Sequence, residues 1–205
     1  MSKGYNFLMP ANSDPTHETY DKFAARIAER FWETELPRAW DAFCARLPEG
    51  AVVADLGCGA GRDTGQFAGR GLWTVGMDYS YGMLLQAAQR APAPYVQGDM
   101  RCLPFADAAL DAAWVNASLL HIPRAQAPGV LAEVWRVLKP GGVLYLSLKE
   151  GEGETWEQRE GMRFFTFFGL EEVHALLSDA GFTLLEEWIE PAKKVTWINL
   201  LARAG

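Results

Sequence analysis

A glycine-rich turn constrains this chain more than any other feature. The stretch Ala54–Asp63 reads ADLGCGAGRD, in which three glycines alternate with other residues behind an aspartate. The run that precedes the turn, AVVADL, is apolar and rich in β-branched residues, which is typical of a buried strand. Turns of this kind bind nucleotides at the carboxyl ends of parallel strands. The sequence therefore predicts an α/β fold with a nucleotide site after its first strand.

Strand-like and helix-like segments alternate along the chain. Strands are expected at 51–56, 72–78, 94–99, 110–116 and 143–149, and helices at 62–69, 80–90, 125–138 and 169–180. The closing segments FTLLEEWIE and KVTWINLLARA predict two more strands, joined by a hairpin around Pro191-Ala192. Strands separated by helices indicate a parallel sheet covered on both faces, and the final pair adds an antiparallel edge.

The two flanks of this core are less regular. Residues 1–16 are polar and interrupted by Pro10 and Pro15, so we expect a flexible arm that also carries His17. The spacing of apolar residues from Thr16 to Leu47 predicts two short helices. The segment 150–162 is charged and is expected to be a loop.

Composition narrows the class of protein. A chain of 205 residues suffices for one α/β domain. Its net charge of −7 and pI near 5.0 argue against general binding to DNA or to a membrane surface. The three cysteines form no C-x-x-C pair, and no signal peptide or apolar run of about 18 residues is visible, so we expect a cytoplasmic protein with reduced thiols.

The spacing of the glycines distinguishes between nucleotides. A dinucleotide fingerprint that starts at Gly57 would need a third glycine at position 62, where this chain has Arg62. Asp55 also stands close to the turn, and a carboxylate there suits a cation better than a pyrophosphate. No Gly-Lys-Ser/Thr follows, which excludes a Walker loop. Asp78 ends the second strand, 21 residues after Gly57, where an acidic residue accepts hydrogen bonds from ribose hydroxyls.

Five motifs together resemble one family. They are ADLGCGAGRD, GMDYS, QGDMRCLPF, LDAAWVNASLLHIP and VLKPGGVLYLSLKEG. In this order and spacing they are similar to the motifs of class I S-adenosylmethionine-dependent methyltransferases. The resemblance implies a Rossmann-like doubly wound sheet of seven strands, in the order 3-2-1-4-5-7-6 with strand 7 antiparallel. It also implies one methyltransferase domain over 1–205, with an N-terminal arm and helical cap (1–48), a cofactor-binding core (49–150), and a substrate-side lid with closing strands (151–205).

The resemblance assigns roles to individual residues. Toward the methionine part of S-adenosylmethionine it places Asp55, Gly57, Cys58, Gly59 and Gly61, with Asp63 either capping a helix or near the cofactor amine. It places Asp78 and Tyr79 at the ribose, Asp99 and Met100 at the adenine, and Asn116 and Ala117 beside the transferred methyl group.

Each candidate residue on the substrate side also has a purely structural interpretation. His121 is a candidate general base or substrate-orienting group, although a lone histidine among apolar residues is often structural. Tyr20 is expected either over the cofactor or in packing. Arg163 and Phe164 belong either to a solvated loop above core phenylalanines or to a lid with an aromatic wall, in which Arg163 neutralises a carboxylate or phosphate.

The leading hypothesis is therefore methyl transfer to the O, N or S atom of a small-molecule acceptor. Methylation of a modified tRNA base or other macromolecule, a non-catalytic S-adenosylmethionine-binding module, and an NAD-dependent oxidoreductase remain as alternatives. Asn116 is not followed by Pro-Pro-Tyr/Phe, which disfavours adenine and amide N-methylation. The sequence shows no cluster of Asp, Asn or His residues that would indicate a metal site. The acceptor and the oligomeric state stay open.

Overall fold

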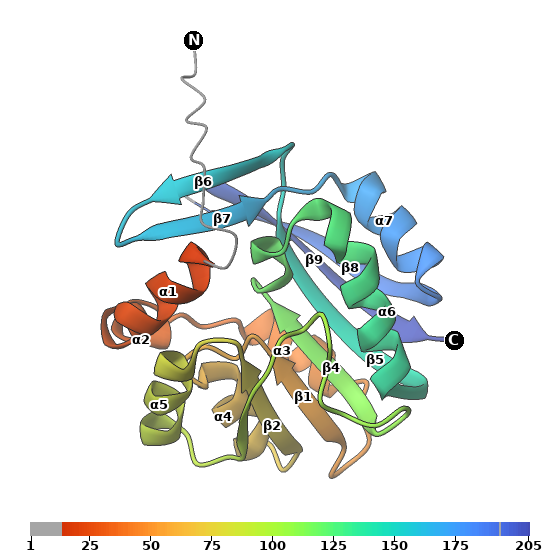
Figure 1. Cartoon of the computed structure of the whole chain (residues 1–205). Helices are drawn as coiled ribbons and strands as arrows, with labels where there is room; N and C mark the ends of the chain where they lie inside the picture. Colours follow the sequence, from red (N-terminus) through yellow and green to blue (C-terminus); the bar gives the residue numbers. More distant parts are fainter. Residues whose placement is uncertain (1–13, 193) are drawn as a thin grey trace.

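A seven-stranded sheet forms the centre of the protein (Figure 1). The structure is a computed structural model and describes residues 14–192 and 194–205. The strands are β1 (Val52–Leu56), β2 (Trp73–Asp78), β3 (Tyr95–Gln97), β4 (Leu110–Asn116), β5 (Leu138–Lys149), β8 (Phe182–Ala192) and β9 (Val195–Ala204). Their order is β3-β2-β1-β4-β5-β9-β8, and β9 runs antiparallel to both of its neighbours. The predicted fold and strand order are confirmed.

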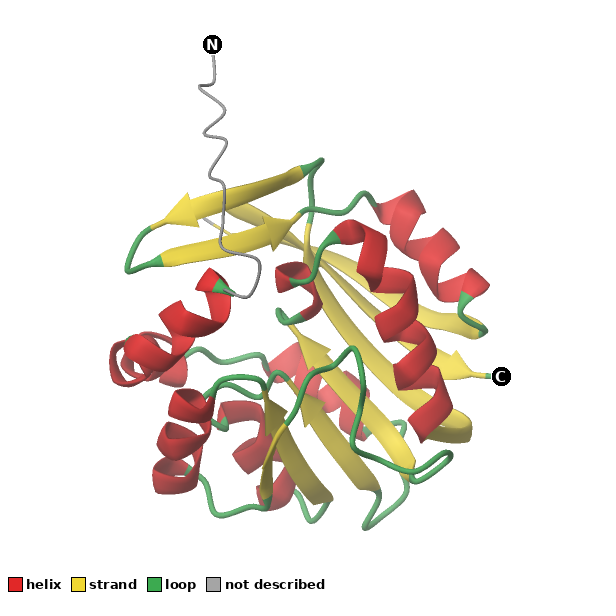
Figure 2. Ribbon diagram, viewed as in Figure 1, coloured by secondary structure: helices red, strands yellow, loops and turns green. Residues whose placement is uncertain are grey.

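Helices cover both faces of the sheet (Figure 2). They include α3 (Pro37–Cys44), α4 (Arg62–Gly69), α5 (Tyr81–Arg90), α6 (Ala127–Val137) and α7 (Leu170–Asp179). Successive residues of a strand face opposite sides. Along β4, Ala113 and Val115 therefore join the core beneath α6 and α7, whereas Ala112 and Trp114 join the core with α3 and α4.

Aromatic packing makes the α3 side of the sheet especially dense. The Trp114 and Tyr145 rings stack with their centroids 3.7 Å apart, and Phe43 and Phe67 meet Trp114 edge-on at 5.1 and 4.9 Å. All four side chains are almost completely buried. This packing fixes β4 and β5 and, with them, the carboxyl edge of the sheet.

The N-terminal part contains three helices where two were expected. They are α1 (Pro15–Lys22), α2 (Ala24–Trp32) and α3. Pro15 occupies the first turn of α1, a position that favours proline, and the Asp14 carboxylate accepts a hydrogen bond from the His17 amide at 3.1 Å. The placement of His17 in a flexible arm was therefore wrong. The rest of the predicted arm, 1–13, lies outside the described residues.

The predicted loop at 150–162 was also wrong, because it contains a strand. β6 (Glu154–Gln158) pairs antiparallel with β7 (Met162–Thr166), and Trp156 lies opposite Phe164. The hairpin docks on α1: the Thr19 hydroxyl donates to the Met162 carbonyl, and the Phe164 amide donates to the Thr16 hydroxyl, both at 2.9 Å. Figure 1 shows the hairpin lying above α1, beyond the carboxyl ends of β1 and β4. Contacts with distant parts of the chain thus stabilise a strand in a segment whose polar sequence does not predict one.

Among the residues described, no helix combines the length and the apolar character that crossing a membrane requires.

Candidate functional site

A cavity of about 150 Å³ lies at the carboxyl edge of the sheet. The loops after β1 to β4 line it together with α1. Of the predicted site residues it is lined by Tyr20, Gly57, Gly59, Asp78, Tyr79, Asp99, Met100, Ala117 and His121. It also has lining residues that the sequence did not single out: Asp14, Thr16, His17, Met77, Ser80, Gly98, Arg101, Ser118 and Ile122. The predicted nucleotide half and α1 thus meet around one space.

The glycines of the turn are required by its backbone and by close packing. Gly57 has φ +77°, and a Cβ there would lie 2.3 Å from the Ser118 Cβ. Gly61 has φ +80°, and its Cβ would lie 2.5 Å from the Tyr95 hydroxyl. Side chains at these positions would force the turn away from its neighbours. Gly61 does not line the cavity, whereas Gly57 and Gly59 do.

Cys58 contributes only its backbone to this edge. Its side chain is buried, and a Cβ on Gly76 of β2 would lie 3.0 Å from the Cys58 sulfur. Burial raises the pKa of the Cys58 thiol. The side chain therefore packs on the sheet as a small neutral group.

Asp78 presents a carboxylate that the backbone holds in place. One oxygen accepts from the Ser80 amide and the other from the Gly59 amide, each at 2.8 Å. A carboxylate has about four acceptor positions, so each oxygen can take a second donor. Burial raises the pKa of Asp78, and the two amide hydrogen bonds oppose that shift. Asp78 is thus an oriented acceptor at the cavity wall.

Asp99 at the other end of the cavity is paired with a residue that sequence reasoning missed. The Arg101 guanidinium approaches both Asp99 oxygens, with a shortest distance of 2.5 Å. Together with the Arg101 amide, this partner holds the pKa of Asp99 below its usual range despite some burial. Met100 lies beside the pair and is 9% exposed.

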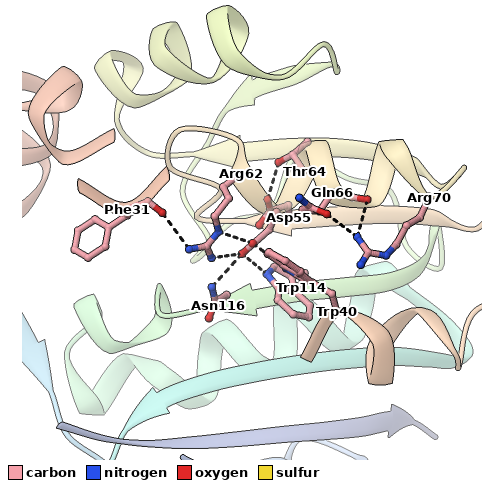
Figure 3. Close-up of polar contacts among 10 residues, drawn as sticks. Phe31, Trp40, Asp55, Arg62, Thr64, Gln66, Arg70, Trp114 and Asn116 are labelled. Carbon is pink, nitrogen blue, oxygen red and sulfur yellow. Dashed lines mark hydrogen bonds and ion pairs between the residues drawn. The ribbon is translucent and has the colours of Figure 1, made fainter. Parts of the chain in front are cut away.

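Asp63 serves as the hub of a buried hydrogen-bond network. Its oxygens accept from the indole nitrogens of Trp40 and Trp114, from two nitrogens of Arg62 and from the Asn116 amide, over distances of 2.8–3.0 Å. Figure 3 shows the side chains of these four partners converging from α3, α4 and β4. Asp63 and Asn116 do not line the cavity. The hub instead fixes the end of β4, where Ala117 follows with φ +52°.

Asp55 lies buried under the turn rather than in the cavity. It is 2% exposed and accepts a hydrogen bond of 2.6 Å from the Thr64 hydroxyl. Burial, reinforced by the nearby Asp63 carboxylate, raises the pKa of Asp55 well above its usual range. A cationic group at the turn would relieve this cost, as expected for the amino-acid end of a ligand.

His121 and Tyr20 form a hydrogen-bonded pair at the end of the cavity near α1. The Nδ1 atom of His121 lies 2.7 Å from the Phe164 carbonyl oxygen, which only accepts, so Nδ1 carries the proton. The Nε2 atom lies 2.9 Å from the Tyr20 hydroxyl and accepts its proton. Burial lowers the pKa of His121 to about 4, and the charges of Arg163 and Lys149 add to the shift. His121 is therefore neutral.

Arg163 and Phe164 come from β7 and lie behind this pair rather than in the cavity lining. Arg163 is 6% exposed, and its Nε atom has no hydrogen-bond partner. The Phe164 ring packs against Trp156 with the centroids 5.2 Å apart. His174 lies in α7, and its Nε2 atom is 2.5 Å from the Glu187 carboxylate. In the part of the chain that the structure describes, no group of three or more His, Cys, Asp or Glu residues is placed to hold a metal ion.

Comparison with known families decides the assignment. Residues 54–146 match the family model described as "Methyltransferase domain", which spans the turn, the Asp78 strand and the end of β4. Residues 54–146 therefore form a methyltransferase domain, and the chain is similar to class I S-adenosylmethionine-dependent methyltransferases. This family uses S-adenosylmethionine as its methyl donor.

Relatives of the methyltransferase differ in what they methylate. A malonyl-[acyl-carrier protein] O-methyltransferase of Erwinia pyrifoliae is 38% identical over 120 residues, which cover 56% of this chain and 45% of that protein. A demethylmenaquinone methyltransferase of Mycolicibacterium vanbaalenii is 37% identical over 116 residues, which cover 57% of this chain and 47% of that protein. The chain thus spans about half the length of these curated relatives.

A solved structure matches the fold over nearly the whole methyltransferase. It is the 1,6-didemethyltoxoflavin-N1-methyltransferase of Burkholderia thailandensis with bound 1,6-didemethyltoxoflavin and S-adenosylhomocysteine. The TM-score is 0.72 at 24% sequence identity, and the match covers 98% of both chains. This similarity extends the shared fold to the N-terminal helices and the closing strands.

The Asp63 network predicts a large loss of stability on truncation. We expect Asp63→Ala to lower the free energy of unfolding by about 3–5 kcal/mol, because it leaves the partly buried Arg62 charge and three other donors without this acceptor. Urea unfolding measures the change. Asp41→Ala is the control: its carboxylate is exposed beside Arg70, and we expect a loss of less than about 0.5 kcal/mol. Equal losses in both variants would contradict the network.

Asp55 predicts a pH-dependent gain of stability on neutralisation. A carboxyl whose pKa rises on folding holds its proton more tightly in the folded chain, so stability falls as pH rises above about 4. The melting temperature of Asp55→Asn should therefore exceed that of the wild type by a margin that grows from pH 5 to pH 8. Asp111→Asn is the control: Lys139 and the Val52 amide lower the pKa of Asp111, so its contribution to stability changes only below about pH 4, and its margin should stay constant from pH 5 to pH 8. A margin for Asp55→Asn that does not change with pH would refute the assignment.

Proposed function

We propose that this methyltransferase transfers the methyl group of S-adenosylmethionine to a small-molecule acceptor bound beside Tyr20 and His121. The observation that carries the proposal is the Asp78 carboxylate, which two backbone amides hold at the wall of the cavity. Its remaining acceptor positions suit the two hydroxyls of a ribose. The family assignment supports the same donor.

The residues present fit the donor along its whole length. Asp78, with Tyr79 beside it, would hold the ribose, and Asp99 with Met100 would hold the adenine. The turn at Gly57 and Gly59 offers a backbone surface without side chains to the methionine part. The buried Asp55 carboxyl beneath the turn favours a cationic amino group nearby. When bound, S-adenosylmethionine supplies a methyl group that is already activated by its positively charged sulfur.

The main contribution of the protein is alignment and exclusion of water. An in-line displacement needs the acceptor atom, the methyl carbon and the sulfur on one line. Ala117 is well placed to limit the space at this point, since it lines the cavity and the Asp63–Asn116 contact holds the strand before it. The α1 helix and the β6–β7 hairpin cover the same edge, as the Thr16 and Thr19 hydrogen bonds require. This cover limits access of water to the reacting atoms.

We assign acceptor binding to the two ends of the chain. Residues 1–48 supply Tyr20, and residues 49–150 supply the donor site and His121. Residues 151–205 supply Arg163 and Phe164, which support this end of the cavity without lining it. The small-molecule class is supported by relatives whose names specify malonyl-[acyl-carrier protein] and demethylmenaquinone as acceptors. The cavity is small, which also suits a small acceptor.

Asp78 provides the sharpest test of the donor site. We expect Asp78→Ala to weaken binding of S-adenosylhomocysteine at least tenfold in calorimetry, because the ribose loses a charged acceptor and the Gly59 amide loses its partner. Asp107→Ala is the matched control, since Asp107 is 81% exposed and lies outside the cavity. Tight binding of NAD with no binding of S-adenosylhomocysteine or S-adenosylmethionine would overturn the proposal.

Turnover separates an enzyme from a binding module. We expect S-adenosylhomocysteine to form from S-adenosylmethionine when the protein meets a panel of small carboxylic acids, quinols, amines and thiols. Mass spectrometry of the products identifies the acceptor atom. Methylation of total RNA with no turnover of the panel would contradict the small-molecule acceptor. Binding without turnover on either would indicate a non-catalytic module.

A further inference from the structure

Two cationic side chains flank one aromatic ring behind the Tyr20–His121 pair. The Lys149 ammonium lies 3.6 Å from the centroid of the Phe165 ring, and the Arg163 guanidinium lies 5.3 Å from it. The His121 ring lies 4.7 Å from the same ring. We call Tyr20, His121, Lys149, Arg163 and Phe165 the basic cluster. It joins the end of β5, β7 and α1 at the carboxyl edge of the sheet.

Neither cation of the basic cluster forms an ion pair with a described residue, although Glu157 lies opposite Arg163 in the hairpin and its charge opposes the lowering of the Lys149 pKa. Over 14–192 and 194–205, no carboxylate lies within 4.0 Å of Arg163 or Lys149, whereas Arg62 and Arg136 each pair with one. Arg163 is also 6% exposed, and its buried Nε atom has no hydrogen-bond partner. Burying a cation without a partner costs free energy, and ring faces recover only part of it. The arrangement therefore favours an anion brought in from outside.

The basic cluster also contains no free proton acceptor. The single lone pair of neutral His121 accepts the Tyr20 hydroxyl, and the Nδ1 proton is donated to the Phe164 carbonyl. The charges of Arg163 and Lys149 further disfavour an imidazolium at this position. An acceptor that arrives protonated finds no base here. An acceptor that arrives as an anion needs none.

We propose that the acceptor is a carboxylate and that methyl transfer goes to its anionic oxygen. The two cations attract the carboxylate to the end of the cavity at Tyr20 and His121. A lone pair of the oxygen forms the new bond to the methyl carbon while the carbon–sulfur bond breaks, and that electron pair stays on sulfur. The sulfonium becomes a neutral thioether, the carboxylate becomes a methyl ester, and no proton moves. The neutral ester then loses its attraction to the cations. This inference deepens the proposed function and rests on it.

The test uses the variants Arg163→Met and Lys149→Met. Each removes the positive charge but keeps a long, unbranched side chain. Arg159→Met is the control, because Arg159 is exposed in the turn of the same hairpin. With S-adenosylhomocysteine bound, ¹⁹F NMR would measure binding of trifluoroacetate, 4-fluorobenzoate and 8-fluorooctanoate, each beside its amide. We expect at least one acid to bind the wild type and Arg159→Met, and to bind Arg163→Met and Lys149→Met at least tenfold more weakly. Binding of the amides should be the same for all four proteins.

Equal responses of the wild type and Arg163→Met to all three acids, including no response, would overturn the inference. A second measurement needs no acid: the melting temperature of Arg163→Met should equal or exceed that of the wild type. A fall comparable to that of Asp63→Ala would show that Arg163 is structural and would also overturn it. Binding of S-adenosylhomocysteine is measured first, by calorimetry, for all four proteins. If all four bind it, a failure to bind the acids counts against the carboxylate acceptor and not against the donor site. If the wild type itself does not bind S-adenosylhomocysteine, that result counts against the proposed function.

Discussion

The carboxyl edge of the sheet depends on the buried Asp63 carboxylate. Its five hydrogen bonds connect the N-terminal helix α3, the first turn of α4 and the end of β4. Each donor would be unsatisfied without it, since Trp40 and Trp114 lie in the apolar core. Because α4 begins at the glycine turn and β4 ends at Asn116, one carboxylate fixes the two segments between which the donor site is built.

Acidic and basic side chains lie on opposite sides of the carboxyl edge of the sheet. On the nucleotide side, Asp55 lies near the end of β1, Asp78 ends β2 and Asp99 follows β3. On the other side, Lys149 ends β5 and Arg163 lies in β7. An acidic side suits a cationic methyl donor, and a basic side suits an anionic acceptor. Transfer of the methyl group neutralises both reactants, so the same field that assembles them releases the products. The overall negative charge of the chain gives no hint of this local division.

Local signals in the sequence were sufficient to predict part of the cavity lining on the side of β1 to β3. The glycine spacing and Asp78 at the end of its strand act through neighbouring residues, and in the structure Gly57, Gly59 and Asp78 all line the cavity. The acceptor half depends on contacts between distant segments. Thr16 and Thr19 hold β7, some 145 residues away, and no periodicity in the charged segment 150–162 marks β6, the strand that pairs with it. The role of Asp63 as a hub likewise requires Trp40 and Trp114, which only the fold brings together.

The central claim is that the cavity beside Asp78 holds the methyl donor. A crystal structure with S-adenosylhomocysteine tests it most directly. The account predicts that the ribose hydroxyls donate to the Asp78 carboxylate and that the thioether lies next to Ala117. A second cavity of about 330 Å³, lined by Trp32, Trp40 and Arg62, provides the contrast. Density for the ligand in that cavity, with Asp78 making no contact to it, would contradict the account.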